Sequence, residues 1–368
     1  MHAFTVSSGS RRLVWLVLDV VAVNVDLVAS ITDAVVAAVP STAAELVWVS
    51  ATHTHSGPET RVGALGEETP AWLVSLLVPA AVLAVRRAVA EEASASLTWH
   101  RGRLDGVGAQ RSGPAPRSWV PVDVLAVRGP AGLSGAVAVL PVHPTVLGAD
   151  SCVVSADLAG AVRRSLGEQL GARTWVMVAT GAAGDVSTRL HRRAQTPEEL
   201  SWLGELAASQ LVNLLATNGF EVAGALDGAV SPDLPMPART DAPDTSTIEA
   251  HRARLVAARA SGDPFAVREA ETALQGAELG VGRRSPSPRL AVSVLRIGDF
   301  TLVGLGGEPY LDLADLLPPK SVLVGYTGGY LGYLPTRAAY ATPTYEVNMT
   351  PVAPGGAELA IEAAERLR

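Results

Sequence analysis

Short apolar runs alternate with longer periodic segments over the first 92 residues. The runs at 13–24 and 47–50 predict buried strands, because they are short, rich in β-branched residues and bounded by polar positions. Segments 26–39 and 70–92 predict helices, and Pro40 ends the first of them. This order of strand, helix, strand, loop and helix indicates an α/β fold.

The same two kinds of segment continue along the rest of the chain. Apolar runs predict strands at 136–142, 175–179, 290–297 and 300–305, and periodic segments predict helices at 157–170 and 197–215. Strands and loops are expected over 96–129, and a surface connection over the Pro-, Asp- and Thr-rich segment 232–246. Residues 247–278 predict a helical hairpin that turns at Gly262-Asp263-Pro264. We expect a mixed β-sheet core flanked by helices, with this hairpin inserted, in a single domain spanning 1–368.

Composition excludes several classes of protein. Hydrophobic residues make up 48% of the 368 positions and charged residues 18%, so a large core can form and general disorder is excluded. The formal charge of −7 gives no excess of basic residues of the kind that binds nucleic acid or anionic lipid. The single cysteine, Cys152, excludes an intramolecular disulfide and a cysteine-rich zinc site.

The beginning of the chain resembles a signal peptide only superficially. Arg11 and Arg12 precede an apolar run, but Asp19 interrupts that run, which favours a buried strand. No apolar stretch is expected to approach the ~18–20 residues that cross a bilayer. We therefore expect a cytoplasmic protein without a stable membrane anchor, and leave open whether it forms a homo-oligomer.

Three of the seven histidines lie at the ends of predicted buried strands. In an extended segment His53 and His55 point to the same side, so both can face one metal ion or a metal and its substrate. His143 ends the apolar run 137–142, and open α/β sheets place ligand sites beyond such strand ends. The alternative for each histidine is a hydrogen-bonded polar residue of the loop or core.

Three further features at strand ends contain residues that can do chemistry. Glu308 follows two glycines and can ligate a metal, or can instead charge the first turn of a helix opened by Pro309. The turn 181–187 can present Ser187 as a nucleophile or donor, or can simply cap a helix. Five of the six tyrosines fall between Tyr326 and Tyr345, where they can line a site or pack in a core.

Taken in order, these segments resemble the motifs of the neutral ceramidase family. The resemblance extends from about residue 13 to 350 and includes five segments: Thr52-His53-Thr-His55-Ser-Gly-Pro58, His143-Pro-Thr with Ser155-Ala-Asp157, Gly184-Asp-Val-Ser187, Gly307-Glu308-Pro309, and Gly329-Tyr330-Leu-Gly-Tyr333 through Tyr345-Glu346. The chain looks like a bacterial relative that has the catalytic domain only, since the C-terminal β-domain of the secreted ceramidases is absent. Gln110 and Thr188 stand where the family often has Asn and Pro.

The resemblance implies a zinc ion as cofactor. Its ligands would be His53, His143, Glu308 and Tyr330, with Tyr333 as the alternative tyrosine. These assignments are carried over from the family, position by position.

The resemblance also implies catalytic roles near the metal. His55 would contact the reacting carbonyl or water, and Tyr333 would assist if it is not a ligand. Arg111, in a segment similar to the family's Asn-Arg-Ser, would bind a substrate oxygen. Ser187 matches a serine sometimes assigned as the nucleophile.

Our hypothesis from the sequence is a zinc-dependent amidohydrolase that cleaves the N-acyl bond of a small-molecule amide, ceramide-like or otherwise. Such a metal acidifies water and polarises an amide carbonyl. One alternative is an acyltransferase or cyclase that uses the same site in specialised metabolism. The other is a non-catalytic binding relative.

Overall fold

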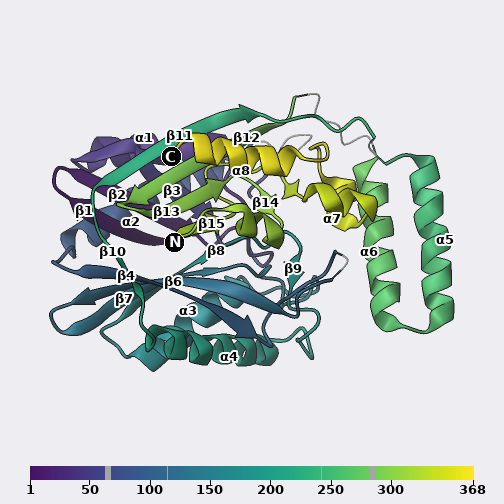
Figure 1. Ribbon diagram of the computed structural model, residues 1–368, viewed down its shortest axis with the longest axis horizontal. Coiled ribbons are helices and arrows are strands. Elements are labelled where there is room, and N and C mark those ends of the chain that lie inside the picture. The colour runs from purple at the N-terminus through teal and green to yellow at the C-terminus, as the bar shows by residue number, and fades with distance from the viewer. Residues whose placement is uncertain (63–67, 114, 242, 282–286) are drawn as a thin grey trace.

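The computed structural model describes residues 1–62, 68–113, 115–241, 243–281 and 287–368 (Figure 1). Its first sheet has the order β1-β2-β3, with bounds His2–Ser8, Arg11–Leu18 and Thr42–Ala51. Strands β2 and β3 are parallel and are joined by helix α1 (Val25–Ala38). Helices α1 and α2 (Ala71–Ala90) pack against one face of this sheet, so β2 is buried on both faces and reads as a continuous apolar run.

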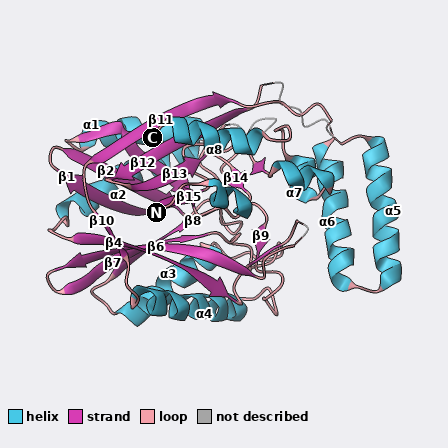
Figure 2. Ribbon diagram, viewed as in Figure 1, coloured by secondary structure: helices cyan, strands magenta, loops and turns pink. Residues whose placement is uncertain are grey.

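The second sheet is covered on its outer face by two helices. Its strands have the order β10-β4-β6-β7-β8, with bounds Phe220–Val222, Ser96–Asp105, Trp119–Gly129, Gly132–Leu140 and Trp175–Thr180. Helix α3 (Asp157–Leu170) connects the parallel strands β7 and β8, and helix α4 (Pro197–Leu215) lies beside it (Figure 2). The Thr196 side chain caps α4 by accepting a hydrogen bond from the Glu199 N–H.

The third sheet is antiparallel except at one edge. Its order is β11-β12-β13-β15, with bounds Leu226–Pro235, Arg289–Ile297, Phe300–Leu305 and Ser321–Val324. Strands β12 and β13 form a hairpin around Gly298, whose φ of 61° and close approach to the Ala223 carbonyl both require glycine. Helix α8 (Gly356–Arg366) packs on the outer face of this sheet.

All three sheets contribute to one apolar cluster at the centre of the molecule. Trp15 and Trp48 of the first sheet meet edge to face, with ring centroids 5.9 Å apart. They belong to the same cluster as Val137 of β7 and Leu302 of β13. This shared core fixes the strand ends of the three sheets relative to one another.

The helical hairpin extends from one end of the molecule (Figure 1). It consists of α5 (Thr245–Ser261) and α6 (Pro264–Gly280). Gly262 adopts a left-handed conformation at its turn, and Asp263 caps α6 by accepting from the Phe265 N–H. Helix α6 packs against the short helix α7 (Tyr345–Met349) at Gly276, where a Cβ atom would lie 2.7 Å from the Tyr345 Cα.

The fold class predicted from the sequence is confirmed: a mixed α/β core, flanking helices and the inserted hairpin are all present. Two predictions are wrong in their boundaries: strand β2 ends at Leu18 rather than at position 24, and the surface connection 232–246 begins with the last residues of β11. Strands β1 and β11 and helix α8 were not predicted. The remaining short elements are β5 (Ala109–Gln110), β9 (Val186–Ser187), β14 (Glu308–Pro309), β16 (Tyr333–Leu334) and the 3-10 helices Leu311–Leu316 and Arg337–Ala341.

The expectation that no apolar segment reaches membrane-spanning length is also wrong. Helix α2 has 20 residues and a mean hydropathy of 1.9, so by length and composition it could cross a bilayer. In the structure it packs against α1 and β1 on one side. Its other side exposes large apolar residues, including Trp72, Leu76 and Leu83.

Candidate metal centre

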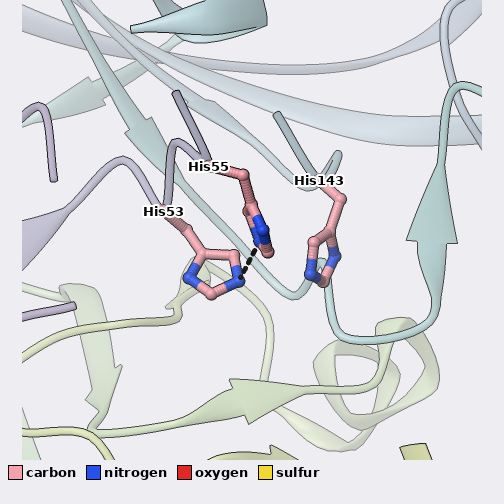
Figure 3. A group of neighbouring side chains, drawn as sticks. All are labelled: His53, His55 and His143. Carbon is pink, nitrogen blue, oxygen red and sulfur yellow. Dashed lines mark hydrogen bonds between the residues drawn. The ribbon is translucent and has the colours of Figure 1, made fainter. Parts of the chain in front are cut away.

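One strand from each of the three sheets ends at the same place, and each of these ends contributes a candidate ligand. His53 and His55 follow β3, His143 follows β7, and Glu308 comes three residues after β13. Figure 3 shows the three imidazoles pointing toward one another. The arrangement explains how residues far apart in the sequence meet: the central core holds the three strand ends together.

The ligand atoms lie close together. One nitrogen from each of the three imidazoles falls within 4.8 Å of the others, and His53 Nε2 and His55 Nε2 are 3.3 Å apart. Glu308 Oε2 is 3.3 Å from His53 Nε2 and 3.1 Å from His143 Nε2. His53, His143 and Glu308 are each at most 2% exposed.

Backbone carbonyls fix the tautomers of two of the imidazoles. His53 Nδ1 donates to the Val21 carbonyl and His143 Nδ1 donates to the Ala183 carbonyl, each over 2.6 Å. Because a carbonyl can only accept, each Nδ1 holds a proton, and a neutral ring then directs the lone pair of its Nε2 into the cluster. Metal-binding histidines are commonly oriented in this way.

Burial determines the charge of these groups. Burial and neighbouring positive charge lower the pKa of His55 to about 3 and that of His143 to about 4, which favours neutral rings at pH 7. Burial alone would raise the pKa of Glu308, whereas its close contacts with the His53 and His143 imidazoles lower that pKa well below its usual value. His143 Nε2 and Glu308 Oε2 are buried and accept no hydrogen bond within the described residues.

The cluster is therefore a set of electron-pair donors that can hold a cation at its centre. Acceptor atoms 3.1–3.3 Å apart repel one another unless a proton or a metal ion lies between them. Burial opposes protonation of His55 and His143, so a metal ion would satisfy these atoms better than a proton. Imidazole and carboxylate donors fit zinc, and they also fit other first-row transition metals.

Strained backbone conformations accompany the cluster. His53 has φ 63° and Tyr326 has φ 54°, although neither is glycine. Such conformations cost about 1–3 kcal/mol each and persist where the surroundings enforce them. Here the Tyr326 ring stacks on the His53 ring at 4.2 Å, and the Tyr326 carbonyl accepts from the Ala51 N–H. Tyr326 comes two residues after β15, and the sequence grouped it with the tyrosines that can line a site but gave it no ligand or catalytic role.

Two tyrosines predicted for the site lie on different sides of it. The Tyr330 hydroxyl donates to Glu308 Oε1 over 2.5 Å, while the Tyr333 ring stacks with the His143 ring at 6.4 Å. Burial raises the pKa of both phenols well above 10. Among the described contacts, Tyr330 is therefore the one of the two whose hydroxyl hydrogen-bonds to a candidate ligand. The Arg61 guanidinium, which the sequence did not single out, lies 5.1 Å from the centre of the Tyr330 ring.

Arg111 is held near the cluster by a buried carboxylate. Its Nε lies 2.7 Å from Glu346 Oε1, and its Nη2 donates to the Gly184 carbonyl. Its charge contributes to lowering the pKa of His143. Glu346, on α7, thus positions Arg111, a role that the sequence did not predict.

Ser187 lies beside His143 in space, but within the described residues it has no hydrogen bond to a ligand atom of the cluster. Strand β9 pairs with β5, and the Val186 carbonyl accepts from the His143 N–H. Within the described residues, the Ser187 hydroxyl accepts only from the Arg189 N–H, over 3.4 Å. The nearby Asp185 instead bridges two loops, because its carboxylate accepts from the Leu311 N–H.

Known structures show a similar fold. A neutral ceramidase from Pseudomonas aeruginosa superposes with a TM-score of 0.73 at 21% identity, over 98% of this chain and 67% of that one. The chain has the neutral ceramidase fold. A ceramidase complexed with C2 superposes with a TM-score of 0.72 at 18% identity, over 98% of this chain and 69% of that one. Neither the protein-family models nor the sequences of curated proteins gave a match. At these identities the likeness establishes the fold alone, so function has to be argued from the site.

Proposed function

We propose that the protein is a zinc-dependent amidohydrolase that cleaves the N-acyl bond of a small-molecule amide. The observation that carries this proposal is the convergence of His53, His143 and Glu308. Glu308 Oε2 lies 3.3 Å from His53 Nε2 and 3.1 Å from His143 Nε2, and within the described residues neither Glu308 Oε2 nor His143 Nε2 accepts a hydrogen bond. These three residues and Tyr330 would hold the ion. The ceramidase fold supports the same reaction class.

A bound zinc ion supplies Lewis acidity, which polarises an amide carbonyl and acidifies water. The residues around the ion then have distinct tasks. His55 is neutral and can accept a hydrogen bond from the attacking water. The Tyr333 hydroxyl stays protonated and can donate to the oxygen that becomes negative in the tetrahedral adduct. Arg111, whose charge acts on His143, would help to stabilise the negative charge on this oxygen.

The leaving amine needs a proton before it departs. Of the three imidazoles in the cluster, His55 is the one that no backbone carbonyl orients among the described contacts, so its ring can move a proton from the water to the amine. Within the described residues, Ser187 has no contact that activates its hydroxyl as a nucleophile. Water is therefore the attacking group in this proposal.

Metal analysis and reconstitution test the proposal. Dialysis against a chelator is expected to abolish hydrolysis of N-acyl amines such as N-octanoylethanolamine, and stoichiometric zinc to restore it. The variant His143→Ala should bind less zinc and lose activity, whereas His2→Gln, at a partly exposed histidine outside the cluster, should do neither. Full activity of a metal-free sample would refute the proposal. Product analysis in the presence of a second amine separates hydrolysis from acyl transfer.

A further inference from the structure

The loop that follows the histidine pair brings an arginine to the candidate metal centre. Arg61 comes six residues after His55, and its guanidinium carbon lies over the face of the Tyr330 ring, 5.1 Å from the ring centre. Tyr330 is also the residue whose hydroxyl donates to Glu308 Oε1 over 2.5 Å. One phenol thus has a candidate metal ligand at its oxygen and a cation over its ring.

The neighbouring residue Thr60 anchors the backbone that carries Arg61. Thr60 is buried, and its hydroxyl donates to the Ala22 carbonyl over 2.9 Å and accepts from the Ala22 N–H over 3.2 Å. The Asn24 side-chain amide donates to the Thr60 carbonyl over 3.3 Å. The same stretch of chain supplies the carbonyl that orients His53, so one segment holds both a candidate ligand and the loop of Arg61.

Glu59 occupies one edge of the Arg61 guanidinium. Arg61 Nε donates to Glu59 Oε1 over 2.8 Å, and its Nη2 donates to Oε2 over 3.1 Å. The Arg61 backbone N–H also donates to Oε1, over 3.0 Å. Two-point pairing of this kind fixes the plane of a guanidinium, because each nitrogen has to face its own oxygen. The flat face of the group is then what Arg61 presents to Tyr330.

The positive charge of Arg61 offsets an unfavourable charge at the phenol oxygen. An oxygen that ligates a metal ion carries negative charge, which burial and the neighbouring Glu308 carboxylate both disfavour. A cation over the ring is attracted to its electron-rich face, and to any negative charge that the phenol gains. The Arg61 side chain is 31% exposed, so solvent screens this attraction only in part.

We propose that Arg61 is a positioning residue that holds the Tyr330 phenol at the metal centre. The inference rests on the proposed function, in which Tyr330 is a ligand of the ion, and it adds the group that keeps this ligand in place. Glu59 fixes the guanidinium, the guanidinium holds the ring, and the hydroxyl of that ring reaches Glu308.

The zinc affinity of two variants tests this contact, measured on the full chain with a competing chelator. Arg61→Met keeps an unbranched side chain but removes the charge. It should weaken zinc binding about 5- to 30-fold, as expected for a partly desolvated cation–π contact. Arg61→Lys keeps a positive charge that can lie over the ring, so its zinc affinity should stay within threefold of the wild type.

Arg103 provides the matched control. Its Nε and Nη2 donate to the two oxygens of Asp105, two residues away, and its guanidinium lies 5.4 Å from the centre of the Trp119 ring. This pair belongs to β4, which carries no residue of the candidate metal centre. Arg103→Met therefore removes the same kind of contact and should leave zinc affinity within twofold of the wild type.

A double variant shows whether Arg61 acts through Tyr330. Tyr330→Phe keeps the ring and removes the oxygen that would bind the ion. In that background Arg61→Met should weaken zinc binding by less than twofold, because no phenol oxygen remains to be positioned. A charge that acted directly on His55 or Glu308 would instead weaken binding by the same factor in both backgrounds.

Zinc affinity needs no turnover, so it separates this proposal from the proposed function. Weaker binding in Arg61→Met, recovery in Arg61→Lys and loss of the effect in the Tyr330→Phe background support the role of Arg61. Unchanged binding in Arg61→Met, or an equal loss in both backgrounds, overturns it. Tight zinc binding without amide hydrolysis refutes the proposed function and leaves the role of Arg61 decided by the variants, whereas a chain that binds no zinc overturns both proposals.

Discussion

Replacing Glu308 by Gln should stabilise the metal-free protein while weakening its binding of zinc. The carboxylate is buried, and its Oε2 accepts no hydrogen bond from a described residue. An unsatisfied buried acceptor costs about 1–3 kcal/mol, and more when it is charged. The amide of Gln removes the charge and can donate to His143 Nε2, 3.1 Å away, while Tyr330 still has an oxygen to donate to.

Protonation of His143 is a poor alternative way to neutralise Glu308. The pKa of His143 is about 4, so holding a proton on this ring at pH 8 costs about 5 kcal/mol, from 1.36 kcal/mol per unit over roughly four units. We therefore expect the metal-free Glu308→Gln variant to exceed the wild type by about 1–3 kcal/mol in free energy of unfolding.

Urea denaturation at pH 8, with and without zinc, measures both parts of this prediction. Wild-type protein should gain about 2.7 kcal/mol when free zinc is 100 times its dissociation constant. At the same zinc concentration the variant should gain at least about 1.4 kcal/mol less, which corresponds to tenfold weaker binding. A metal-free variant that is less stable than the wild type would show that protons hold the cluster together, and the reasoning would fail.

A second buried glutamate provides the control. Glu346 pairs with Arg111 over 2.7 Å, so Glu346→Gln leaves a buried guanidinium without its counterion. Breaking such a pair typically costs about 3–5 kcal/mol. The same substitution should therefore stabilise the metal-free chain at position 308 and destabilise it at position 346.

Three other expectations concern the ligand set, the hairpin and acid stability. Tyr330→Phe should weaken zinc binding about 10- to 100-fold, as measured with a competing chelator. Tyr333→Phe should weaken it less, because among the described contacts only the Tyr330 hydroxyl donates to the candidate ligand Glu308. Gly276→Val should destabilise the protein by about 1–3 kcal/mol in thermal unfolding, because its Cβ would meet the α7 backbone, whereas the exposed Gln275→Val should not. Charged partners lower the pKa of Asp19 in the folded protein. Its contribution to folding stability is therefore complete above the pKa of the unfolded chain, near ~3.9, and is lost as the pH falls below that value. In urea denaturation, the difference in stability between the wild type and Asp19→Asn should shrink below pH ~4.

Periodicity predicted most of the helices and strands because burial imposes it directly. Helix α3 matches its predicted bounds, and the hairpin turns at the expected glycine. Strand β2 ended earlier than predicted because the apolar residues from Val20 to Val23 are buried in a loop and not in a strand. Strand β11 was missed because it lies at a sheet edge, where polar and exposed positions interrupt its apolar pattern.

The site was predictable only in part, because spacing identifies side chains and not their partners. The sequence singled out the three histidines and Glu308 at strand ends, and the structure brings them together. It could not show that Glu346 positions Arg111, since this contact depends on where α7 packs.

The packing of α7 is also what connects the hairpin to the chemistry. Gly276 lets α6 approach α7, and α7 places Glu346 against Arg111, whose charge acts on His143. We therefore expect that a substitution in the hairpin can alter the candidate metal centre without touching any ligand. Local sequence patterns cannot reveal such an effect, because each contact in the series joins elements that are distant in the chain. The hairpin packs on α7, and α7 carries the carboxylate that holds Arg111 beside the candidate site.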